Sequence, residues 1–523
     1  MCYGNKIIMN NPSLTLRLAV LLWLITSIFL VGANAATDAK ILRLKPLGQR
    51  RLLQGPILGG STTAFFEHLL DNQGKIAVLS QMNIGLDRFP GGSDANFYNW
   101  RTGLIEIQEY ADSSPYVHFW AKAAVKIAKG MPDGITMEQY AAFSQQIGAQ
   151  VIFVPNLESS SIAEQVKWFK HLAGRGLVPQ RIELGNEFWV AMGNDPRSLA
   201  RWPDALSSMR TMKQYLDAFK PYLPANAKIA VQAAASGFSV HHNPRAPFWQ
   251  RIEKWDDQLR PEPWFHAVTL HLYPRLSEVM GDPRAGFTPV TRENAMPRLR
   301  AMMAQVDDGV ERILQGMERR LPDKEIWITE WNSRGANAVT QRGADIEPAS
   351  PAMEMLLATR MALVHLRHSS VTVSLFFMYD FRQKNPSSMF ILDSTGGYSP
   401  VPTATALRWL NEAANGGGSF QRLVQEGAKP IAGEGVMPQS YLAIEGGVFQ
   451  SKERATLILE NVSADLFSLD PATSVPNKRP STIEFMSMPD LVKGDKLSAR
   501  IEHQDYAGSI TITPFSVTRV IWE

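Results

Sequence analysis

Two glutamates, Glu187 and Glu330, have the sequence setting that paired-acid chemistry requires. Glu330 ends the short apolar run 326–329, which is rich in β-branched and aromatic residues and too short for a helix, so it favours a buried parallel strand. Glu187 follows a second run of the same build that begins at Arg181. Because α/β barrels place their chemistry at the carboxyl ends of such strands, the pair predicts a site with two opposed acids.

The chain around these glutamates alternates between buried-strand patterns and amphipathic-helix patterns. Eight candidate strands lie near Ile57, Ile84, Val151, Ile182, Ile229, Val268, Ile326 and Val373. Capping-box patterns at Thr136 and Ser161 predict the starts of two intervening helices. Eight strands that alternate with helices predict an α/β fold, the (β/α)₈ or TIM barrel. Strands four and seven face each other across the mouth of such a barrel, so Glu187 and Glu330 would bracket a ligand.

The C-terminal part of the chain has a different pattern. Three glycines at 416–418 break the last helical pattern, and short alternating strands separated by turn residues follow. This pattern is typical of a β-sandwich. We therefore expect a catalytic barrel over residues 55–410 and an accessory β-sandwich over residues 411–523. Residues 36–54 are predicted to supply a strand to the sandwich, because the two ends of a domain often meet.

Residues 1–35 have the pattern of a secretory signal peptide: a basic start, an apolar stretch at 18–32 and the small-residue site Ala33-Asn34-Ala35. The apolar stretch is shorter than the roughly 20 residues that a membrane span needs, so a cleaved signal is favoured over a retained anchor. Cys2, the only cysteine, lies inside this segment. The mature chain would then have no disulfide and no cysteine nucleophile. We expect an exported protein, periplasmic or secreted.

Composition excludes several classes of partner. The chain has 53 basic and 50 acidic side chains, which are interspersed and give a net charge of +3. Neither a nucleic acid nor an anionic membrane surface is favoured by this balance, and the predicted partner is a carbohydrate. A hydrophobic content of 45% supports a large buried core. The oligomeric state stays open.

Glycoside hydrolysis needs two carboxyl groups beside the scissile bond, one to protonate the leaving oxygen and one to attack or to activate water. A single glutamate at a strand end would be an ordinary surface carboxylate. Two of them on facing strands, with Asn186 and Trp331 adjacent, favour catalysis. No metal or organic cofactor is expected, since the neighbouring histidines at 241–242 would point to opposite sides of a strand and have no evident third ligand.

The arrangement of Asn186-Glu187 after strand four and Glu330 after strand seven resembles glycoside hydrolase clan A, the retaining (β/α)₈ hydrolases. The resemblance implies that Glu187 is the general acid/base, that Asn186 binds the sugar 2-hydroxyl and that Glu330 is the nucleophile. It also implies that His271 or Tyr273, after strand six, hydrogen-bonds the nucleophile. A retaining mechanism predicts carboxyl groups roughly 5 to 5.5 Å apart, whereas about 9 Å would indicate inversion.

Within the clan, the chain is similar to the α-L-arabinofuranosidases that carry a C-terminal β-sandwich. The shared motifs are Arg88-Phe89-Pro90-Gly91-Gly92, Tyr98-Asn99-Trp100, Leu184-Gly185-Asn186-Glu187 and Glu330-Trp331-Asn332. Two departures concern the sugar: Thr329 stands where an acidic residue is expected in these enzymes, and the loop 156–161 differs. The β-glucuronidase or heparanase-like, β-xylosidase-like and agarase-like members of the clan therefore stay open.

Polar and aromatic residues at the strand ends are the predicted substrate contacts. They are Arg88, Asn96, Asn186, Trp189, His271, Tyr273, Trp331 and Tyr379. An aromatic face can stack on the C–H surface of a sugar, although core packing explains each ring equally well. The expected function is hydrolysis of a plant or algal polysaccharide or its oligosaccharides. A transglycosidase, or a carbohydrate-binding protein that has lost catalysis, are the alternatives.

Overall fold

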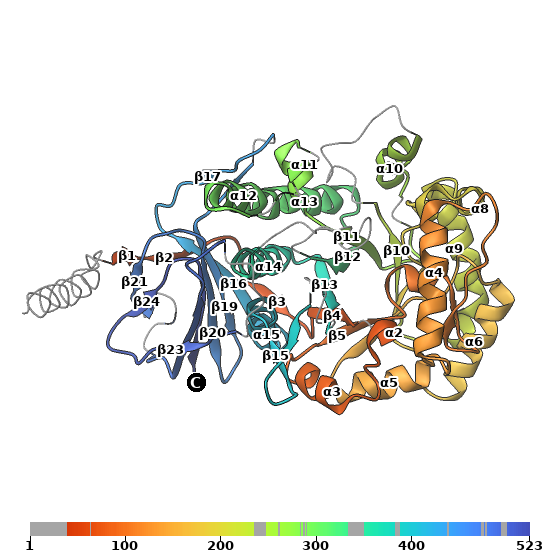
Figure 1. The fold of residues 1–523 in the computed structure, drawn as a ribbon, viewed down its shortest axis with the longest axis horizontal. Helices are drawn as coiled ribbons and strands as arrows, with labels where there is room; N and C mark the ends of the chain where they lie inside the picture. Colours follow the sequence, from red (N-terminus) through yellow and green to blue (C-terminus); the bar gives the residue numbers. More distant parts are fainter. Residues whose placement is uncertain are drawn as a thin grey trace, which may run out of the picture.

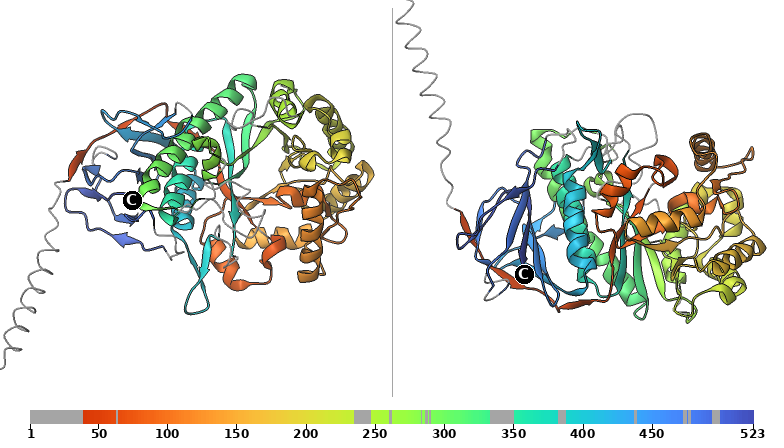
Figure 2. Two further views of the ribbon diagram at one scale, coloured as in Figure 1. Left: turned by 45° about the horizontal axis from the view of Figure 1, so that its top comes forward. Right: turned by 90° about the horizontal axis from the view of Figure 1, so that it is seen from below.

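A computed structural model describes residues 39–62, 64–234, 247–259, 262–282, 284–285, 288, 290–332, 350–381, 388–436, 439–471, 475, 478–492 and 499–523. The predicted signal peptide and the histidines at 241–242 lie outside these residues. None of the described helices has both the length and the apolar character needed to cross a membrane. Figures 1 and 2 show the C-terminal strands, in blue, at one end of the molecule and the α/β part at the other.

Eight parallel strands form a closed barrel, so the predicted fold is confirmed. In chain order they are β4 (Leu58–Thr62), β5 (Leu86–Phe89), β8 (Gln150–Phe153), β9 (Arg181–Glu183), β10 (Lys228–Gln232), β11 (Ala267–Leu272), β12 (Glu325–Trp331) and β13 (Val371–Tyr379). The circle closes where β13 pairs with β4. An apolar cluster from these strands, which includes Leu86, Ile152 and Trp327, is fully buried. Side chains therefore fill the barrel, and ligands are left to the loops at its mouth.

Helices surround the strands, and several of them begin at a capping side chain. The longer ones are α3 (Gln73–Ser80), α5 (Met137–Gln146), α6 (Ile162–Gly174), α9 (Ala205–Phe219), α10 (Pro247–Gln258), α12 (Arg292–Ala304), α13 (Val310–Arg320), α14 (Pro351–Arg367) and α15 (Pro402–Asn415). Thr136 and Gln139 form a complete capping box at the start of α5. The helical segment from Arg292 to Arg320 is interrupted by a π-helical turn, η4 (Gln305–Gly309).

Further elements lie in the loops that connect the barrel strands and helices. The segment after β5 contains the 3₁₀ turn η1 (Gly92–Asn96), the hairpin β6 (Tyr98–Asn99) and β7 (Leu104–Ile105), and helix α4 (Pro115–Gly130). Figure 1 shows α4, in orange, at the end of the molecule remote from the C-terminal strands. The other short elements are α2 (Ala64–Glu67), α7 (Ala191–Asn194), α8 (Pro196–Arg201), η2 (Lys220–Tyr222), α11 (Leu276–Met280), β14 (Phe390–Leu392), β15 (Tyr398–Pro400), β17 (Ile431–Ala432) and β18 (Ser440–Tyr441).

The C-terminal strands form antiparallel sheets, as predicted for a β-sandwich. They are β16 (Gly418–Gln425), β19 (Ile444–Gln450), β20 (Ala455–Asn461), β21 (Phe467–Leu469), β22 (Thr482–Ser487), β23 (Glu502–His503), β24 (Ile510–Ile512) and β25 (Ser516–Trp522). Three N-terminal strands join them: β2 (Leu44–Pro46) and β3 (Arg51–Leu53) pair with β16, and β1 (Lys40–Leu42) pairs with β21. The first strands of the chain thus belong to the last domain.

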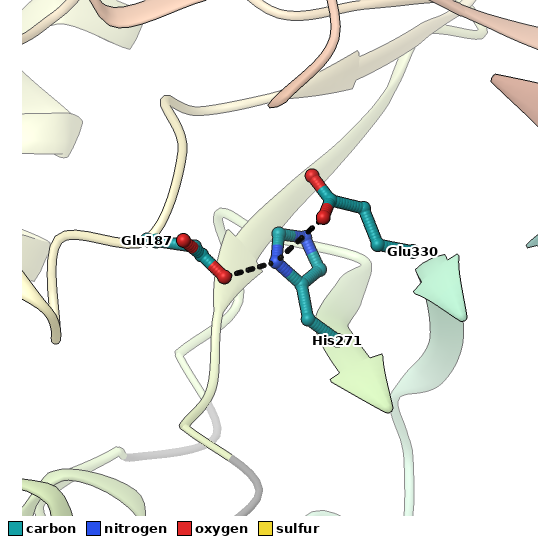
Figure 3. Close-up of side chains that lie close together, drawn as sticks. All are labelled: Glu187, His271 and Glu330. Atoms are coloured by element: carbon teal, nitrogen blue, oxygen red, sulfur yellow. Dashed lines mark hydrogen bonds and ion pairs between the residues drawn. The ribbon is translucent and has the colours of Figure 1, made fainter. Parts of the chain in front are cut away.

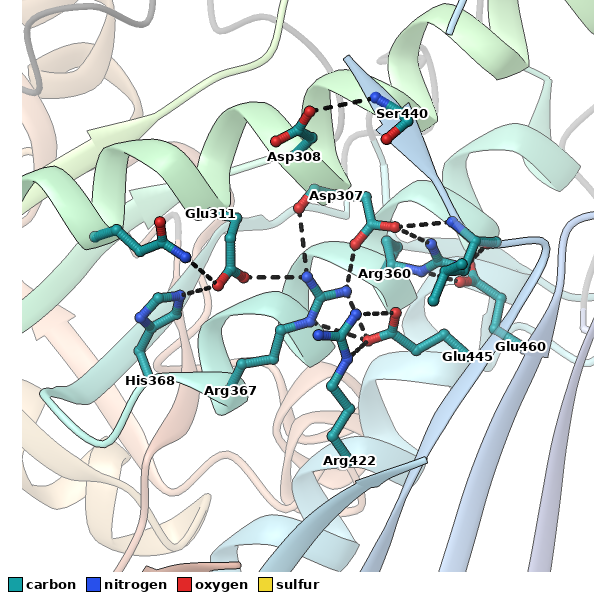
Figure 4. Close-up of polar contacts among 12 residues, drawn as sticks. Asp307, Asp308, Glu311, Arg360, Arg367, His368, Arg422, Ser440, Glu445 and Glu460 are labelled. Atoms are coloured by element: carbon teal, nitrogen blue, oxygen red, sulfur yellow. Dashed lines mark hydrogen bonds and ion pairs between the residues drawn. The ribbon is translucent and has the colours of Figure 1, made fainter. Parts of the chain in front are cut away.

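Barrel and sandwich meet at a buried group of charges, which we call the interdomain network (Figure 4). Its members are Asp307, Glu311, Arg360, Arg367, Arg422, Glu445 and Glu460. Arg360 of α14 binds Asp307 of η4 at 2.9 Å and Glu460 of β20 at 2.7 Å. Glu445 of β19 accepts from Arg367 at 2.6 Å. The network ties one face of α14 to three strands of the sandwich sheet.

Candidate active site

Glu330 lies near the end of β12 with both of its oxygens held. Nη1 of Arg88 binds Oε1 at 2.6 Å, and the phenol of Tyr273 donates to Oε2 at 2.5 Å. Glu330 is 5% exposed. Two donors, one of them charged, fix the carboxylate in a single orientation.

An irregularity in β12 explains why Thr329 and Glu330 both contribute to the site. Ile328 pairs with Leu270 of β11, but the next pair joins Glu330 to His271, so Thr329 is an extra residue on the β12 side. Such a bulge re-aims side chains that would otherwise alternate between the two faces. Thr329 accordingly donates to Glu183 at 3.1 Å, inside the same group of polar residues.

Arg88 of β5 is the buried hub of this group. It makes two bonds to Glu183 of β9, at 2.7 and 3.0 Å, and one to the side-chain oxygen of Asn186 at 2.9 Å. Burial would raise the pKa of Glu183, but the charges of Arg88 and His271 outweigh it and lower that pKa. Glu183 is therefore a permanent anion that holds Arg88 in place for Glu330.

His271 of β11 lies between the two predicted catalytic acids (Figure 3). Its Nδ1 is 2.8 Å from Oε1 of Glu187 and 3.7 Å from Oε2 of Glu330. Its Nε2 is 3.2 Å from the hydroxyl of Thr329. Burial would lower the pKa of His271, but the charge of Glu330 and the bonds to Glu183 and Glu187 raise it to about 10. The ring is an imidazolium at neutral pH, with both nitrogens donating.

Glu187 is carried by a strained loop. Strand β9 ends at Glu183, four residues earlier than Glu187, which has a φ of 51°. A left-handed conformation costs a residue other than glycine about 1–3 kcal/mol. Gly185 (φ 82°) makes the turn, and a Cβ there would lie 1.9 Å from the ring of Phe188. The side chain of Glu187 is 21% exposed, more than those of Glu330 and His271. It forms the open side of the site.

The distance between the acids is short. One oxygen of Glu187, one oxygen of Glu330 and a ring nitrogen of His271 all lie within 4.8 Å of one another. These three groups have the spacing of ligands to a divalent ion. The ring of His271 thus lies between the two carboxylates, with Nδ1 toward both of them.

Most of the predicted site residues come together, but several do not face a ligand. Arg88, Asn186, Glu187, His271, Tyr273 and Glu330 form one connected group. Arg88 and Asn96 were predicted to contact substrate, yet both are buried. Asn96 donates instead to the backbone oxygen of Asn186 at 2.9 Å. Both side chains position other residues of the site, and their contact with substrate stays a prediction.

Three of the four predicted aromatic contacts lie outside this connected group. Trp331 is buried edge-on against Phe376, and Tyr379 is buried beside Phe390. Trp189 is partly buried against the core. The aromatic residue of β13 that borders the site is Phe377. Its ring centroid lies 6.3 Å from that of Tyr273, with the two rings edge to face. A register shift between Phe377 and Tyr379 breaks the alternation along β13, so their side chains do not share one environment.

Sequence reasoning missed Glu183 and Gln232. Gln232 of β10 accepts from the backbone N–H of Phe188 at 3.2 Å and donates to the carbonyl of Gly185, so it clamps both sides of the Glu187 turn. The sequence did contain a signal for both residues, because each is a charged or amide side chain within an otherwise apolar strand pattern. Burial of such groups requires partners, and Arg88 was the complementary charge on a nearby strand.

Comparison with known proteins gives the fold context. No protein-family model matches the sequence, and no curated protein matches it. Among solved structures, the chain is similar to AbfB, a family 51 α-L-arabinofuranosidase from Bifidobacterium longum (TM-score 0.63, 11% identity, 93% of this chain and 99% of that one). The chain has the fold of a glycoside hydrolase.

Two further solved structures support the same fold. The family 51 arabinofuranosidase from Xanthomonas axonopodis pv. citri aligns with a TM-score of 0.59 at 13% identity, over 92% of this chain and 100% of that one. A family 44 xyloglucanase from Paenibacillus polymyxa aligns with a TM-score of 0.57 at 12% identity, over 92% and 99%. The resemblance to the clan A barrels is thereby confirmed for the fold.

Proposed function

We propose that this chain is a retaining glycoside hydrolase with Glu330 as nucleophile and Glu187 as general acid/base. The observation that carries the proposal is the approach of the two carboxylates to within 4.8 Å across the barrel mouth. Retaining enzymes hold their carboxyl groups about 5–5.5 Å apart, whereas inverting enzymes leave about 6.5–9.5 Å for a water molecule. The fold shared with glycoside hydrolases supports the same conclusion.

In the first step, an oxygen of Glu330 attacks the anomeric carbon while Glu187 gives its proton to the leaving oxygen. The glycosidic bond breaks and an ester to Glu330 forms. In the second step, Glu187 takes a proton from water, the hydroxide attacks the anomeric carbon, and the ester bond breaks to return Glu330 as a carboxylate. Tyr273 and Arg88 hold the two Glu330 oxygens in place for the attack.

His271 balances the charge during both steps. Its Nδ1–H faces Glu187, so it stabilises the carboxylate that Glu187 becomes after it donates its proton. When the ester forms, the charge of Glu330 disappears and the imidazolium still has a partner. A cation between the acids lets two carboxylates lie close together in a buried site.

The free donor of Asn186 supports a sugar as the substrate. Its side-chain oxygen is taken by Arg88, while its Nδ2 is buried and has no partner among the described residues. This supports a role in binding a sugar hydroxyl, as the clan resemblance implies for the 2-hydroxyl. An α-L-arabinofuranoside is the first candidate sugar because family 51 arabinofuranosidases are structural neighbours. A β-glucan is the second, since a xyloglucanase and an endoglucanase also align.

The test is hydrolysis of aryl glycosides (α-L-arabinofuranoside, β-D-xyloside, β-D-glucuronide, β-D-galactoside and β-D-glucoside) with NMR detection of the first anomer released. We expect one of these to be cleaved with retention and Glu330→Gln to abolish cleavage. Glu187→Ala should keep cleavage of a dinitrophenyl glycoside, whose leaving group needs no proton, and lose that of a disaccharide. Binding of polysaccharide without cleavage of any substrate would favour the carbohydrate-binding alternative.

A further inference from the structure

Helix α4 is fastened to the loop that carries Glu187. The hydroxyl of Ser114 at its N-terminus donates to the carbonyl of Met192 at 2.6 Å, and Ser114 N–H binds Asp195 at 3.0 Å. Tyr116 lies directly against the same loop, because a Cβ on Gly193 would lie 2.7 Å from the Cβ of Tyr116. The first turn of α4 therefore forms a wall beside the proposed general acid.

Tyr116 is the inner end of this wall. Its phenol is 2.7 Å from the hydroxyl of Ser93, in the turn that follows β5. Burial first, and then the charges of Glu187 and Glu330, raise the pKa of Tyr116. The phenol is thus close enough to both acids to feel their charges.

From Tyr116, aromatic rings continue outward along α4. The ring centroids of Tyr116 and Trp120 lie 6.4 Å apart. Those of Trp120 and Phe119 lie 5.7 Å apart, with the rings edge to face. Positions three and four residues after Tyr116 share one side of the helix, so the three rings form a continuous surface. Phe119, the outermost of the three, is 41% exposed.

Tyr110 lies in the segment that leads into α4. Its neighbour Glu109 binds His118 of α4 at 2.9 Å, which joins the loop to the helix. The guanidinium of Arg197 covers the ring of Tyr110 at 4.0 Å and is held by Asp112 at 2.7 Å. Tyr110 is nevertheless 42% exposed, and it and Phe119 are the large exposed aromatic side chains of the described residues. Core packing accounts for the inner rings but not for these two.

We propose that Tyr116, Trp120, Phe119 and Tyr110 form an aromatic track that binds the leaving-group side of an oligosaccharide chain. The proposal rests on the proposed function, because it takes Glu187 as the acid that touches the leaving oxygen. Sugars beyond that oxygen then lie on the outer side of Glu187, where α4 is fastened. Aromatic faces that are rigid and half-open suit the C–H surfaces of neutral sugars. The substrate is accordingly a chain of several sugars, and the long leaving group supplies binding energy.

The experiment compares kcat/KM for an aryl glycoside with kcat/KM for neutral oligosaccharides from the disaccharide to the hexasaccharide, using arabino-, xylo- and cello-oligosaccharides as probes. For the wild type, kcat/KM should rise with chain length. Phe119→Ala and Tyr110→Ala should each lower kcat/KM for the longest chain about threefold to tenfold relative to the aryl glycoside. Val125→Ala is the matched control, since Val125 is an exposed apolar residue of α4 outside the track.

The outcomes separate the two proposals. If the wild type cleaves an aryl glycoside but the track variants change both substrates equally, or neither, the track is refuted and the proposed function stands. If the wild type cleaves none of the substrates, the proposed function fails. In that case, calorimetric titration with the hexasaccharides decides on the track, because weaker binding by Phe119→Ala supports it and unchanged binding refutes it.

Discussion

The candidate active site and the interdomain network both bury arginine among carboxylates, yet they differ in how completely the carboxylates are paired. In the network, Asp307 binds Arg360, Arg367 and the N–H of Leu442, so each of its oxygens is occupied. In the candidate site, His271 is the partner found for Glu187, which stays partly exposed. Pairing of both oxygens, as at Asp307, suits a structural ion group, whereas an acid with one partner at an opening suits chemistry.

Charged groups in both regions have pKa values shifted by their partners. Burial would raise the pKa of Glu311 in the network, but bonds to His368 and Arg367 lower it to about 2. In the site, nearby carboxylates raise the pKa of Arg88 and of His271 above their ordinary values, so both stay charged near neutral pH. Four substitutions test this contrast.

The largest effect is expected for Arg88→Met. Glu183 would be left buried without its main partner, and Glu330 would lose one of its two donors. Unfolding free energy should fall by about 3–5 kcal/mol, and hydrolysis should be lost. Urea denaturation and aryl-glycoside assays measure the two effects. Arg88→Lys, which keeps the charge without the fork of donors, should fold better and still lose most activity; a fully active Arg88→Met would contradict the assigned role.

Arg367→Met should destabilise the protein by a similar amount, about 3–5 kcal/mol, because it leaves Asp307 and Glu445 under-paired in a buried interface. Here the kcat of the folded protein should stay within about twofold, since effects at separate sites are largely independent. Both quantities are measured below the transition temperature of the variant. A proportionate loss of kcat would mean that the network and the site are coupled.

Replacement of His271 by Gln tests the cation between the acids. The folded pKa of about 10 lies above the ordinary value of 6.5, so the stabilisation from His271 is fully present below about pH 6.5 and is lost as pH rises through 10. Wild-type unfolding free energy should therefore decline between these limits, and His271→Gln should show a flatter profile. Denaturation at a series of pH values provides the measurement. Identical slopes for both proteins would assign the decline to other groups.

The smallest effect is expected for Tyr273→Phe, which removes one hydrogen bond to Glu330. A bond to a charged group is worth about 1.5–3 kcal/mol, so kcat/KM should fall about tenfold to a hundredfold. Tyr140→Phe is the matched control: the Tyr140 phenol donates to Asp87 over the same 2.5 Å, but away from the two acids. The control should lower stability with little loss of activity. Equal activity losses would indicate a general effect of losing a buried phenol.

Local signals made much of this architecture predictable. Apolar runs and capping patterns such as Thr136 with Gln139 depend on neighbouring residues. They located the strand that carries Glu330 and the strand that leads to the Glu187 loop. The side that each residue faces was harder to predict. The extra residue at Thr329 turns Glu330 inward. The register shift in β13 leaves Phe377, and not the predicted Tyr379, beside the site. Periodicity cannot reveal such shifts, because they depend on pairing with strands distant in sequence.

The pairing of buried charges is equally hard to predict from the sequence. A buried Glu183 is stable only because Arg88, 95 residues earlier in the chain, reaches it, and the π-helical turn at η4 carries Asp307 to a network completed by residues of the sandwich. The types of these residues were visible in the sequence. Their partners follow from tertiary structure alone, since no local pattern specifies them.

The pairing of β1, β2 and β3 with C-terminal strands has a consequence for synthesis on the ribosome. These strands are translated first, but β16 and β21 appear only after the whole barrel has been made. Until then their hydrogen-bonding edges have no native partner, and an unpaired edge invites association with other chains. The nascent protein thus completes its sandwich late, and a ribosome that stalls within the barrel would release a chain with both ends unsatisfied.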